Sequence, residues 1–331
     1  MCGMLSKAKN AGSVAYNIVK SAEFFLVAQS DHLSETYAKH KGRIELIRAV
    51  SEIFIDEGKT LNAVKKELLS KYINAEPLER IRIRRDIDFV DSSMRQLGIY
   101  NKSLLYLPTH EDVTKQNSET KEISEHWLDK FNELARARNE EWRAELLARG
   151  LAAETTNPGT LSPRALWLIG TLEERLFKAL GYLINLCSDI GDALVIPKTL
   201  SALLHQDFAD CPLGPMVGIG TLLYMLDEIG LVADTSKAVI QLKQGKAFSA
   251  SYLSARYKVT CKKRDFELND IMFSPTGDSI ARLCKRMDNA LGRKFFNEWI
   301  TTLPTVDFAV VNLSEGPTDK QDNNTLNNRE N

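Results

Sequence analysis

The 331-residue chain has no excess of charge of either sign. It carries 43 Lys and Arg residues against 44 Asp and Glu, which gives a formal net charge of −1. A chain this close to neutral lacks the overall field that draws a protein to nucleic acid or to an anionic membrane. The composition therefore removes the whole-chain electrostatic argument for polyanion binding, while a local basic patch stays open.

Paired cysteines are also lacking. The chain has five cysteines, an odd number, and no two of them form a CxxC pair. This spacing excludes a zinc ribbon and argues against a disulfide framework. Cys187 and Cys284 lie among apolar residues, where an inert buried thiol is expected. An N-terminal nucleophile at Cys2 is the alternative chemistry, but residues 5–9 lead into a helix, and we set it aside.

Long apolar segments are missing as well. No run approaches the roughly 18 uncharged residues that a transmembrane helix needs. The apolar stretch after Gly12 is interrupted by Asn17, Lys20 and Glu23, so no signal peptide is predicted. We therefore expect a cytoplasmic protein without a membrane partner.

Catalytic signatures are absent too: the chain contains no GxxxxGK[ST], no GxGxxG after a strand, no HExxH and no GxSxG. Gly214, Gly218 and Gly220 enter a helix as in a phosphate-binding loop, but no Lys-Ser/Thr pair follows. His32 and His40 stand eight residues apart, whereas helical metal-binding pairs stand three or four apart. We expect no metal, no cofactor and no catalytic residue.

What the sequence does contain is helical periodicity, which predicts a mainly α fold. Residues 1–107 predict a helical N-terminal domain, with apolar residues at helical spacing over 14–26 and 44–54. Gly58 is a predicted C-cap for the second of these helices, and Thr60 would open a third.

A fourth helix is predicted to start at Pro77 and to end at Gly98. Its apolar positions form a seam for another helix because they repeat in steps of four and three residues: Ile83, Ile87, Val90, Met94 and Leu97. The same helix carries four arginines that either face phosphates or form a solvated flank beside nearby acids: Arg80, Arg82, Arg84 and Arg85.

A linker and a second helical domain follow. Residues 108–125 hold almost no large apolar side chain and predict a linker. Residues 126–210 predict a central helical domain that begins with a pair of helices separated near Asn139. The polar residues 311–331 predict a disordered tail.

Two cap signals mark the central domain. Ser162 before Pro163 predicts an N-cap with proline at the first helical position. Thr171 and Glu174 fit a capping box for an apolar central helix that runs to Cys187.

Residues 211–310 predict a C-terminal winged-helix-like α+β unit. A helix over 216–231 ends in Gly-Leu and is followed by strand-like segments at 239–242 and 257–261, then by another helix. A basic triplet would lie at the wing, where phosphates are commonly bound: Lys262, Lys263 and Arg264.

The stretch from Trp127 to Cys187 contains a set of cap, turn and core residues: Trp142, Leu146, Leu147, Ala148, Glu154, Pro158, Gly159, Ser162, Arg164, Leu166, Thr171, Glu174, Leu176 and Phe177. Through these residues the stretch is similar to an uncharacterised bacterial family, domain of unknown function 2806. The resemblance spans roughly 126–290 and includes a later match at 274–280.

The resemblance implies a bacterial, cytoplasmic protein, from a kind of family that we associate with phage-defence loci. Its matched residues are mostly caps, turn formers and core positions. Arg164 stands out among them, because it could brace the Pro-Gly turn through Glu154 or Glu174, or bind an anion.

Two functions from different classes remain. The first is a non-enzymatic protein that acts through contacts with a protein partner, with an oligomer as an option. The alternative is a DNA-binding regulator that uses Lys262, Lys263 and Arg264. An enzyme is the third class, and no signature in the sequence supports it.

Overall fold

The computed structural model describes residues 17–18, 20–21, 43–108, 122–198, 203, 219–233, 240–262, 266–268, 271–303 and 307–313. The chain divides into two compact units. Unit 1 comprises the chain up to Glu174 together with Ser279–Cys284, and unit 2 comprises Arg175–Asp278 and the chain from Lys285 onward. The described residues are mainly helical, with an antiparallel sheet in the C-terminal part, which confirms the coarse fold prediction.

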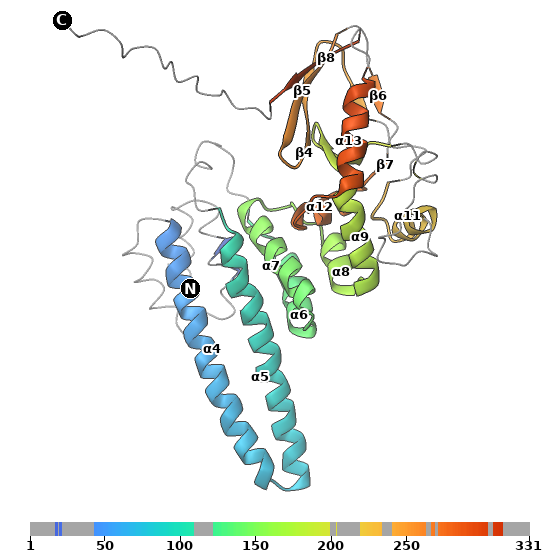
Figure 1. The fold of residues 1–331 in the computed structure, drawn as a ribbon. Helices are drawn as coiled ribbons and strands as arrows, with labels where there is room; N and C mark the ends of the chain where they lie inside the picture. The colour runs from blue at the N-terminus through green and yellow to red at the C-terminus, as the bar shows by residue number, and fades with distance from the viewer. Residues whose placement is uncertain are drawn as a thin grey trace, which may run out of the picture. The chain divides into compact units, whose positions relative to one another are not determined.

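Unit 1 is helical (Figure 1). Its elements are α4 (Arg43–Asn74), α5 (Pro77–Ser103), the 3-10 helix η2 (Leu104–Tyr106), α6 (Glu125–Ala137), α7 (Glu141–Thr156), α8 (Pro163–Thr171) and the end of α12 (Pro275–Leu283). α4 and α5 form an antiparallel hairpin, and Ile83, Val90 and Leu97 of the predicted seam are buried. The predicted break near Asn139 is confirmed between α6 and α7.

Two predicted helix ends are wrong. Gly58 lies inside α4 and Gly98 lies inside α5, so each helix continues past the glycine. A glycine that ends a helix adopts a positive φ, and neither of these two does so. Thr60 opens no new helix, because its hydroxyl donates to the carbonyl of Asp56 one turn earlier, at 3.1 Å.

The two cap signals of the central region have different outcomes. Ser162 is the N-cap of α8, and its Oγ accepts from the backbone N–H of Ala165 at 3.1 Å, as predicted. The capping box at Thr171 is wrong: Thr171 is the last residue of α8. Its hydroxyl donates to the Trp167 carbonyl at 2.9 Å. The hydroxyl is therefore used at the end of one helix and not at the start of the next.

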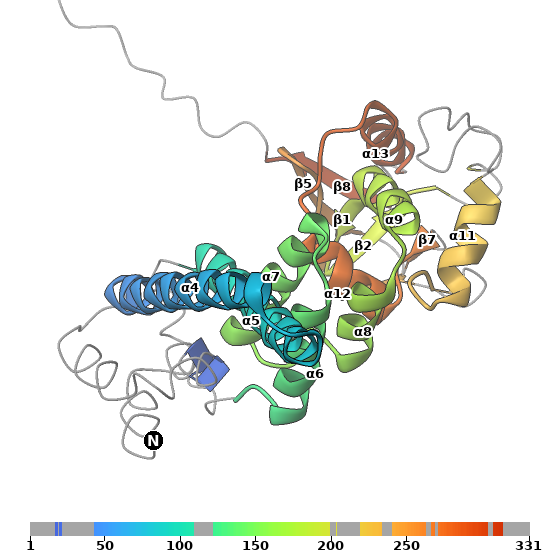
Figure 2. The ribbon, with the colours of Figure 1, turned by 90° about the horizontal axis from the view of Figure 1, so that it is seen from below.

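Unit 2 combines helices with a six-stranded sheet, seen from another side in Figure 2. The sheet order is β7-β2-β1-β4-β5-β8, and each pair that joins these strands is antiparallel. The elements are α9 (Glu174–Leu186), β1 (Ser188–Ile190), β2 (Ala193–Ile196), α11 (Ile219–Glu228), β3 (Ile240–Leu242), β4 (Ala247–Tyr252), β5 (Ala255–Cys261), β6 (Phe266–Leu268), β7 (Ile271–Met272), α12, α13 (Ala290–Thr302) and β8 (Phe308–Asn312).

Helix α13 covers one face of this sheet. Phe296 and Trp299 of α13 pack in one buried cluster with Val195, Tyr252 and Val259 of the strands. The winged-helix-like layout is not confirmed, because the β4–β5 hairpin that would form a free wing is flanked by β1 on one side and β8 on the other. β8 also extends into the stretch predicted as a tail. Residues 109–121 of the predicted linker and 314–331 of the tail lie outside the described residues.

Candidate functional site

A buried glutamate holds the turn before α8. The Glu154 side chain is 3% exposed, and its two carboxylate oxygens accept from the backbone N–H groups of Gly159 (2.7 Å) and Leu161 (3.0 Å). Burial raises the pKa of Glu154, although these hydrogen bonds act in the opposite direction. The carboxylate is committed to the turn and is not free to act on a substrate.

A buried arginine on the same helix holds the other end of α8. The Arg143 side chain donates to the carbonyls of Gly170 (2.7 Å) and Leu172 (2.8 Å). Glu140 lies 3.5 Å from the Arg143 guanidinium, and burial lowers the pKa of Arg143. A cation at a helix C-terminus satisfies carbonyls that have no partner inside the helix. α7 thus fixes both ends of α8, which is a structural role.

Arg164, the charged residue singled out from the sequence, has an exposed side chain on α8. The Glu154 carboxylate, its proposed partner, already accepts from two backbone groups of the turn. The turn is therefore braced by Glu154 through backbone N–H groups.

The thiols of the described residues are buried or partly buried. Cys187 and Cys261 are fully buried, and burial raises the pKa of the Cys187 thiol well above its usual range. Burial also raises the pKa of Cys284 to about 11. A nucleophilic cysteine needs a lowered pKa and access to solvent, so neither Cys187 nor Cys284 suits that role. Cys2 and Cys211 lie outside the described residues, as do His32, His40, Gly214, Gly218, Lys263 and Arg264.

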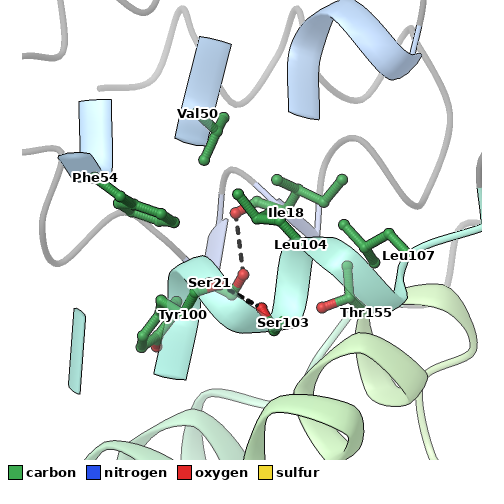
Figure 3. A pocket seen from close by; sticks show the side chains of 9 residues that line it. All are labelled: Ile18, Ser21, Val50, Phe54, Tyr100, Ser103, Leu104, Leu107 and Thr155. Carbon is green, nitrogen blue, oxygen red and sulfur yellow. Dashed lines mark hydrogen bonds between the residues drawn. The ribbon is translucent and has the colours of Figure 1, made fainter. Parts of the chain in front are cut away.

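Unit 1 contains a small pocket (Figure 3). It is lined by Ile18, Ser21, Val50, Phe54, Tyr100, Ser103, Leu104, Leu107 and Thr155. The Ser21 hydroxyl donates to the Ile18 carbonyl, and the Ser103 hydroxyl donates to the Tyr100 carbonyl. Burial raises the pKa of the Tyr100 phenol, whose hydroxyl donates to Asn132 Oδ1 at 2.7 Å. The hydroxyls of Ser21, Tyr100 and Ser103 are thus engaged in hydrogen bonds, and five of the other lining residues are apolar.

The described part of the chain holds neither a metal cluster nor a membrane span. There, no three His, Cys, Asp or Glu side chains gather closely enough to hold a metal ion. None of the helices described combines the length and apolarity needed to cross a bilayer.

A basic corner forms at one end of the β4–β5 hairpin. Lys243, Lys246 and Lys262 are exposed there. The Cys261 N–H donates to the Lys246 carbonyl at 3.1 Å, and the Gln244 side-chain amide donates to the Lys262 carbonyl at 3.2 Å. These bonds bring the turn before β4 next to Lys262. Sequence reasoning identified Lys262 and missed the other two lysines, which stand 16 or more residues earlier in the chain.

One stripe along α5 changes from buried to exposed partway down the helix. Steps of three and four residues place Leu78, Arg82, Arg85, Phe89, Ser93, Gln96 and Tyr100 on one side of the helix. Gln96 and Tyr100 are buried, and both donate to Asn132 Oδ1 of α6 at 2.7 Å. The Arg136 side chain of α6 donates to Gln96 at 2.7 Å.

The other half of the stripe is uncovered. Leu78 is 69% exposed and Phe89 is 61% exposed, and Arg82 and Arg85 between them are also exposed. In Figure 1 the α4–α5 hairpin extends beyond the end of α6. We call these four residues the uncovered stripe. Their spacing is visible in the sequence, but their exposure depends on where α6 ends, which only the structure shows.

The four arginines singled out from the sequence do not all belong to the uncovered stripe. Arg80 donates to the Ala75 carbonyl at 2.8 Å and so supports the turn between α4 and α5. Arg82 and Arg85 belong to the uncovered stripe, whereas Arg84 falls outside that spacing.

A protein-family model matches residues 106–296, more than half of the chain, and its description is a protein of unknown function, DUF2806. No curated protein and no solved structure matches the chain.

Proposed function

The chain belongs to the DUF2806 family of proteins of unknown function, and on that premise we propose that it acts by binding a partner protein through the uncovered stripe of α5. The observation that supports this proposal is the continuity of the stripe. Its upper half already packs against a helix of the same chain, through Gln96 and Tyr100. Its lower half presents Leu78 and Phe89 to solvent.

The chemistry of the stripe suggests what would cover it. An exposed Phe and Leu at helical spacing fit the apolar face of an amphipathic helix, with Phe89 as the anchor. Arg82 and Arg85 lie between these two apolar residues, so the partner helix would carry acidic side chains beside its apolar ones. The proposed activity is adaptor-like binding, without a catalytic step in this chain.

The test compares a Leu78→Ser/Phe89→Ser double variant with wild type. Removing an aromatic anchor is expected to weaken partner binding about thirtyfold. Proteins that copurify with the tagged chain from its own cells would be quantified by mass spectrometry. In the phage-defence setting that the resemblance implies, the same variant would also lose protection in a plaque assay.

Ile73→Ser on α4 is the matched control, because Ile73 is 72% exposed on the same hairpin but lies outside the stripe. Both variants should melt like wild type, since neither changes a buried side chain. Equal recovery of every copurifying protein by the double variant and the control would contradict the proposal.

A second candidate function, a DNA-binding regulator, is favoured by the basic corner. Three exposed lysines at one end of a hairpin could contact successive phosphates, and Lys263 and Arg264 follow directly in the sequence. We expect Lys243→Ala/Lys246→Ala/Lys262→Ala to make the salt dependence of duplex binding less steep. The slope of log K against log salt should fall by about 0.9 for each phosphate that the variant no longer neutralises.

The measurement is fluorescence anisotropy with random-sequence duplex DNA over a range of salt concentrations. A Lys59→Ala/Lys66→Ala/Lys71→Ala variant of α4 removes the same charge from another surface and should bind like wild type. No binding by the wild-type chain at low salt would end this candidate.

A further inference from the structure

The turn between α4 and α5 carries exposed aliphatic side chains on both of its flanking helices. They are Leu69, Ile73, Leu78 and Ile81, which are 44%, 72%, 69% and 69% exposed, and we call them the hairpin tip. Each lies within five residues of the end of its helix, at Asn74 or Pro77, which is about 8 Å along a helix axis. In Figure 1 the turn lies beyond the end of α6. This end of the hairpin therefore presents an apolar group of side chains to solvent.

Contacts within the hairpin hold this turn in a defined shape. The Arg80 side chain donates to the carbonyls of Ala75 (2.8 Å) and Ile73 (3.4 Å). Its guanidinium also lies 6.0 Å from the centre of the Tyr72 ring. The end of α4 is thus fastened to the first turn of α5, so the exposure of the hairpin tip is a feature of a braced turn and not of a frayed helix end.

A second group of side chains, all basic, lies farther from the turn. These residues are exposed and stand five to eight residues from the same helix ends, about 8 to 12 Å along the axes, and we call them the basic belt: Lys66, Arg82, Arg84 and Arg85. Acids are fewer here, because residues 66–85 include six basic and three acidic side chains, a net charge of +3. One of the acids, Glu67, is bonded to Lys71 at 2.6 Å, and the other two, Glu76 and Glu79, are exposed nearer the turn. The hairpin thus changes from apolar near its end to net basic farther from it.

We propose that the hairpin tip inserts into the surface of an anionic membrane, with the basic belt on the lipid headgroups. Helices that bind a membrane interface bury apolar side chains roughly 5 to 10 Å into the boundary between headgroups and acyl chains. The aliphatic side chains of the tip span a depth of that size, and the belt follows at the level of the headgroups. Lys and Arg suit this place because their long stems pack against apolar groups while their charges reach the headgroups.

Charge and apolarity together favour a lipid surface over other occupants. A second copy of the chain would place two segments of net charge +3 against each other. A nucleic acid would bind the basic belt through its phosphates but would leave the aliphatic side chains of the tip in water. A membrane with anionic headgroups offers a partner to both groups of side chains at once.

The sequence-based expectation of no membrane partner rested on the lack of a long apolar run. A surface contact made by one end of a hairpin needs no spanning segment. The chain's net charge of −1 does not oppose it either. Electrostatic attraction is screened beyond roughly 8 Å at physiological salt, so the charges nearest the membrane dominate.

Cosedimentation of the full chain with lipid vesicles tests the insertion. The wild-type chain should bind phosphatidylcholine vesicles that contain about 30 mol% phosphatidylglycerol about tenfold more tightly than vesicles of phosphatidylcholine alone. Ile73→Ser/Ile81→Ser should weaken this binding about thirtyfold, because two aliphatic side chains no longer favour the membrane. Ile55→Ser/Val64→Ser is the matched control and should bind like wild type. Its two residues are 47% and 40% exposed on α4 but lie at least ten residues from the end of that helix.

A charge variant tests the basic belt. Lys66→Ala/Arg84→Ala should weaken binding to the anionic vesicles about tenfold or more, since each basic side chain near such a surface strengthens binding roughly fivefold. Arg48→Ala/Lys59→Ala removes the same charge from exposed positions that lie 15 or more residues from the end of α4. This control should bind like wild type.

Hydrogen exchange locates the contact. Exchange of the peptide that spans 69–81 should slow when anionic vesicles are added, whereas peptides of α9 should be unaffected. No binding to anionic vesicles, equal binding to neutral vesicles, or binding that both the tip variant and the belt variant retain would overturn the proposal. Loss of copurifying proteins by Ile73→Ser/Ile81→Ser, with no vesicle binding by the wild-type chain, would also overturn it and would mark the tip as a protein-binding surface.

The result can be told apart from that of the proposed function. Ile73→Ser/Ile81→Ser leaves all four residues of the uncovered stripe in place, so it should lose vesicle binding and keep its partner proteins. Phe89→Ser leaves the hairpin tip in place, so it should bind vesicles like wild type and lose its partner proteins.

Discussion

A Gly277→Ala substitution is expected to destabilise unit 2 by about 3 kcal/mol or more. A Cβ at this position would lie 1.8 Å from the Leu231 carbonyl oxygen and 2.8 Å from its carbon. The obstacle is backbone, which cannot rotate away as a flexible side chain can. The Leu231 carbonyl is also held in place, because it accepts from the Ser274 N–H at 3.0 Å.

The Ser274 side chain adds two hydrogen bonds to this region. Its hydroxyl donates to the Gly230 carbonyl at 2.6 Å and accepts from the Gly277 N–H at 3.0 Å. Moving α12 to make room for a methyl group would therefore disturb the hydrogen bonds that join Ser274 to the Leu231 and Gly230 carbonyls. Urea unfolding followed by hydrogen exchange would report the loss within unit 2.

Gly181→Ala in α9 is the matched control. Nothing lies within 4 Å of a Cβ built at Gly181, so alanine there should be neutral or should stabilise by up to about 1 kcal/mol through its helix propensity. If Gly277→Ala unfolded at the same urea concentration as this control, the close approach of α12 to Leu231 would be wrong.

Arg143→Met is the second large effect, with an expected loss of about 3 kcal/mol in unit 1. Arg143 is 4% exposed, and methionine fills similar space without donors. The carbonyls of Gly170 and Leu172 would lose their partners while staying near the core. Tryptophan fluorescence during urea unfolding is a direct measurement, since Trp127, Trp142 and Trp167 all lie in unit 1.

Arg164→Met is the control, because Arg164 is exposed on the helix that Arg143 supports. It should change stability by no more than about 0.5 kcal/mol. A loss after Arg164→Met as large as the loss after Arg143→Met would contradict the expected difference between the two arginines.

Much of the helical part could be predicted from the sequence by rules that use only neighbouring residues. Pro77 starts its helix through its fixed φ, and Ser162 caps its helix through a side-chain oxygen. Neither effect depends on distant residues. Gly58 and Thr171 carried equally clear signals and were misinterpreted. At Gly58 the helix α4 continues close to Leu97 of α5, and Thr171 uses its hydroxyl within α8.

The sheet and the two candidate surfaces depend on distant parts of the chain. β1 has three residues, too few for an alternating pattern, and it pairs with β4 about 60 residues later. The uncovered stripe is defined by where α6 ends, and the basic corner by where the turn before β4 meets Lys262, as far as the described residues show. Sequence periodicity reports which residues share a face, but it does not report whether another element covers that face.

The division of unit 1 into two stretches of sequence has a consequence for synthesis on the ribosome. Residues 279–284 complete unit 1, yet they are translated 110 residues after Glu174. Their contribution includes Leu283, whose carbonyl accepts from Arg149 at 3.1 Å. At roughly 5 to 20 residues per second, a nascent chain would wait about 5 to 20 s with its helical unit unfinished. During that interval the surface of unit 1 that residues 279–284 later cover is accessible to chaperones.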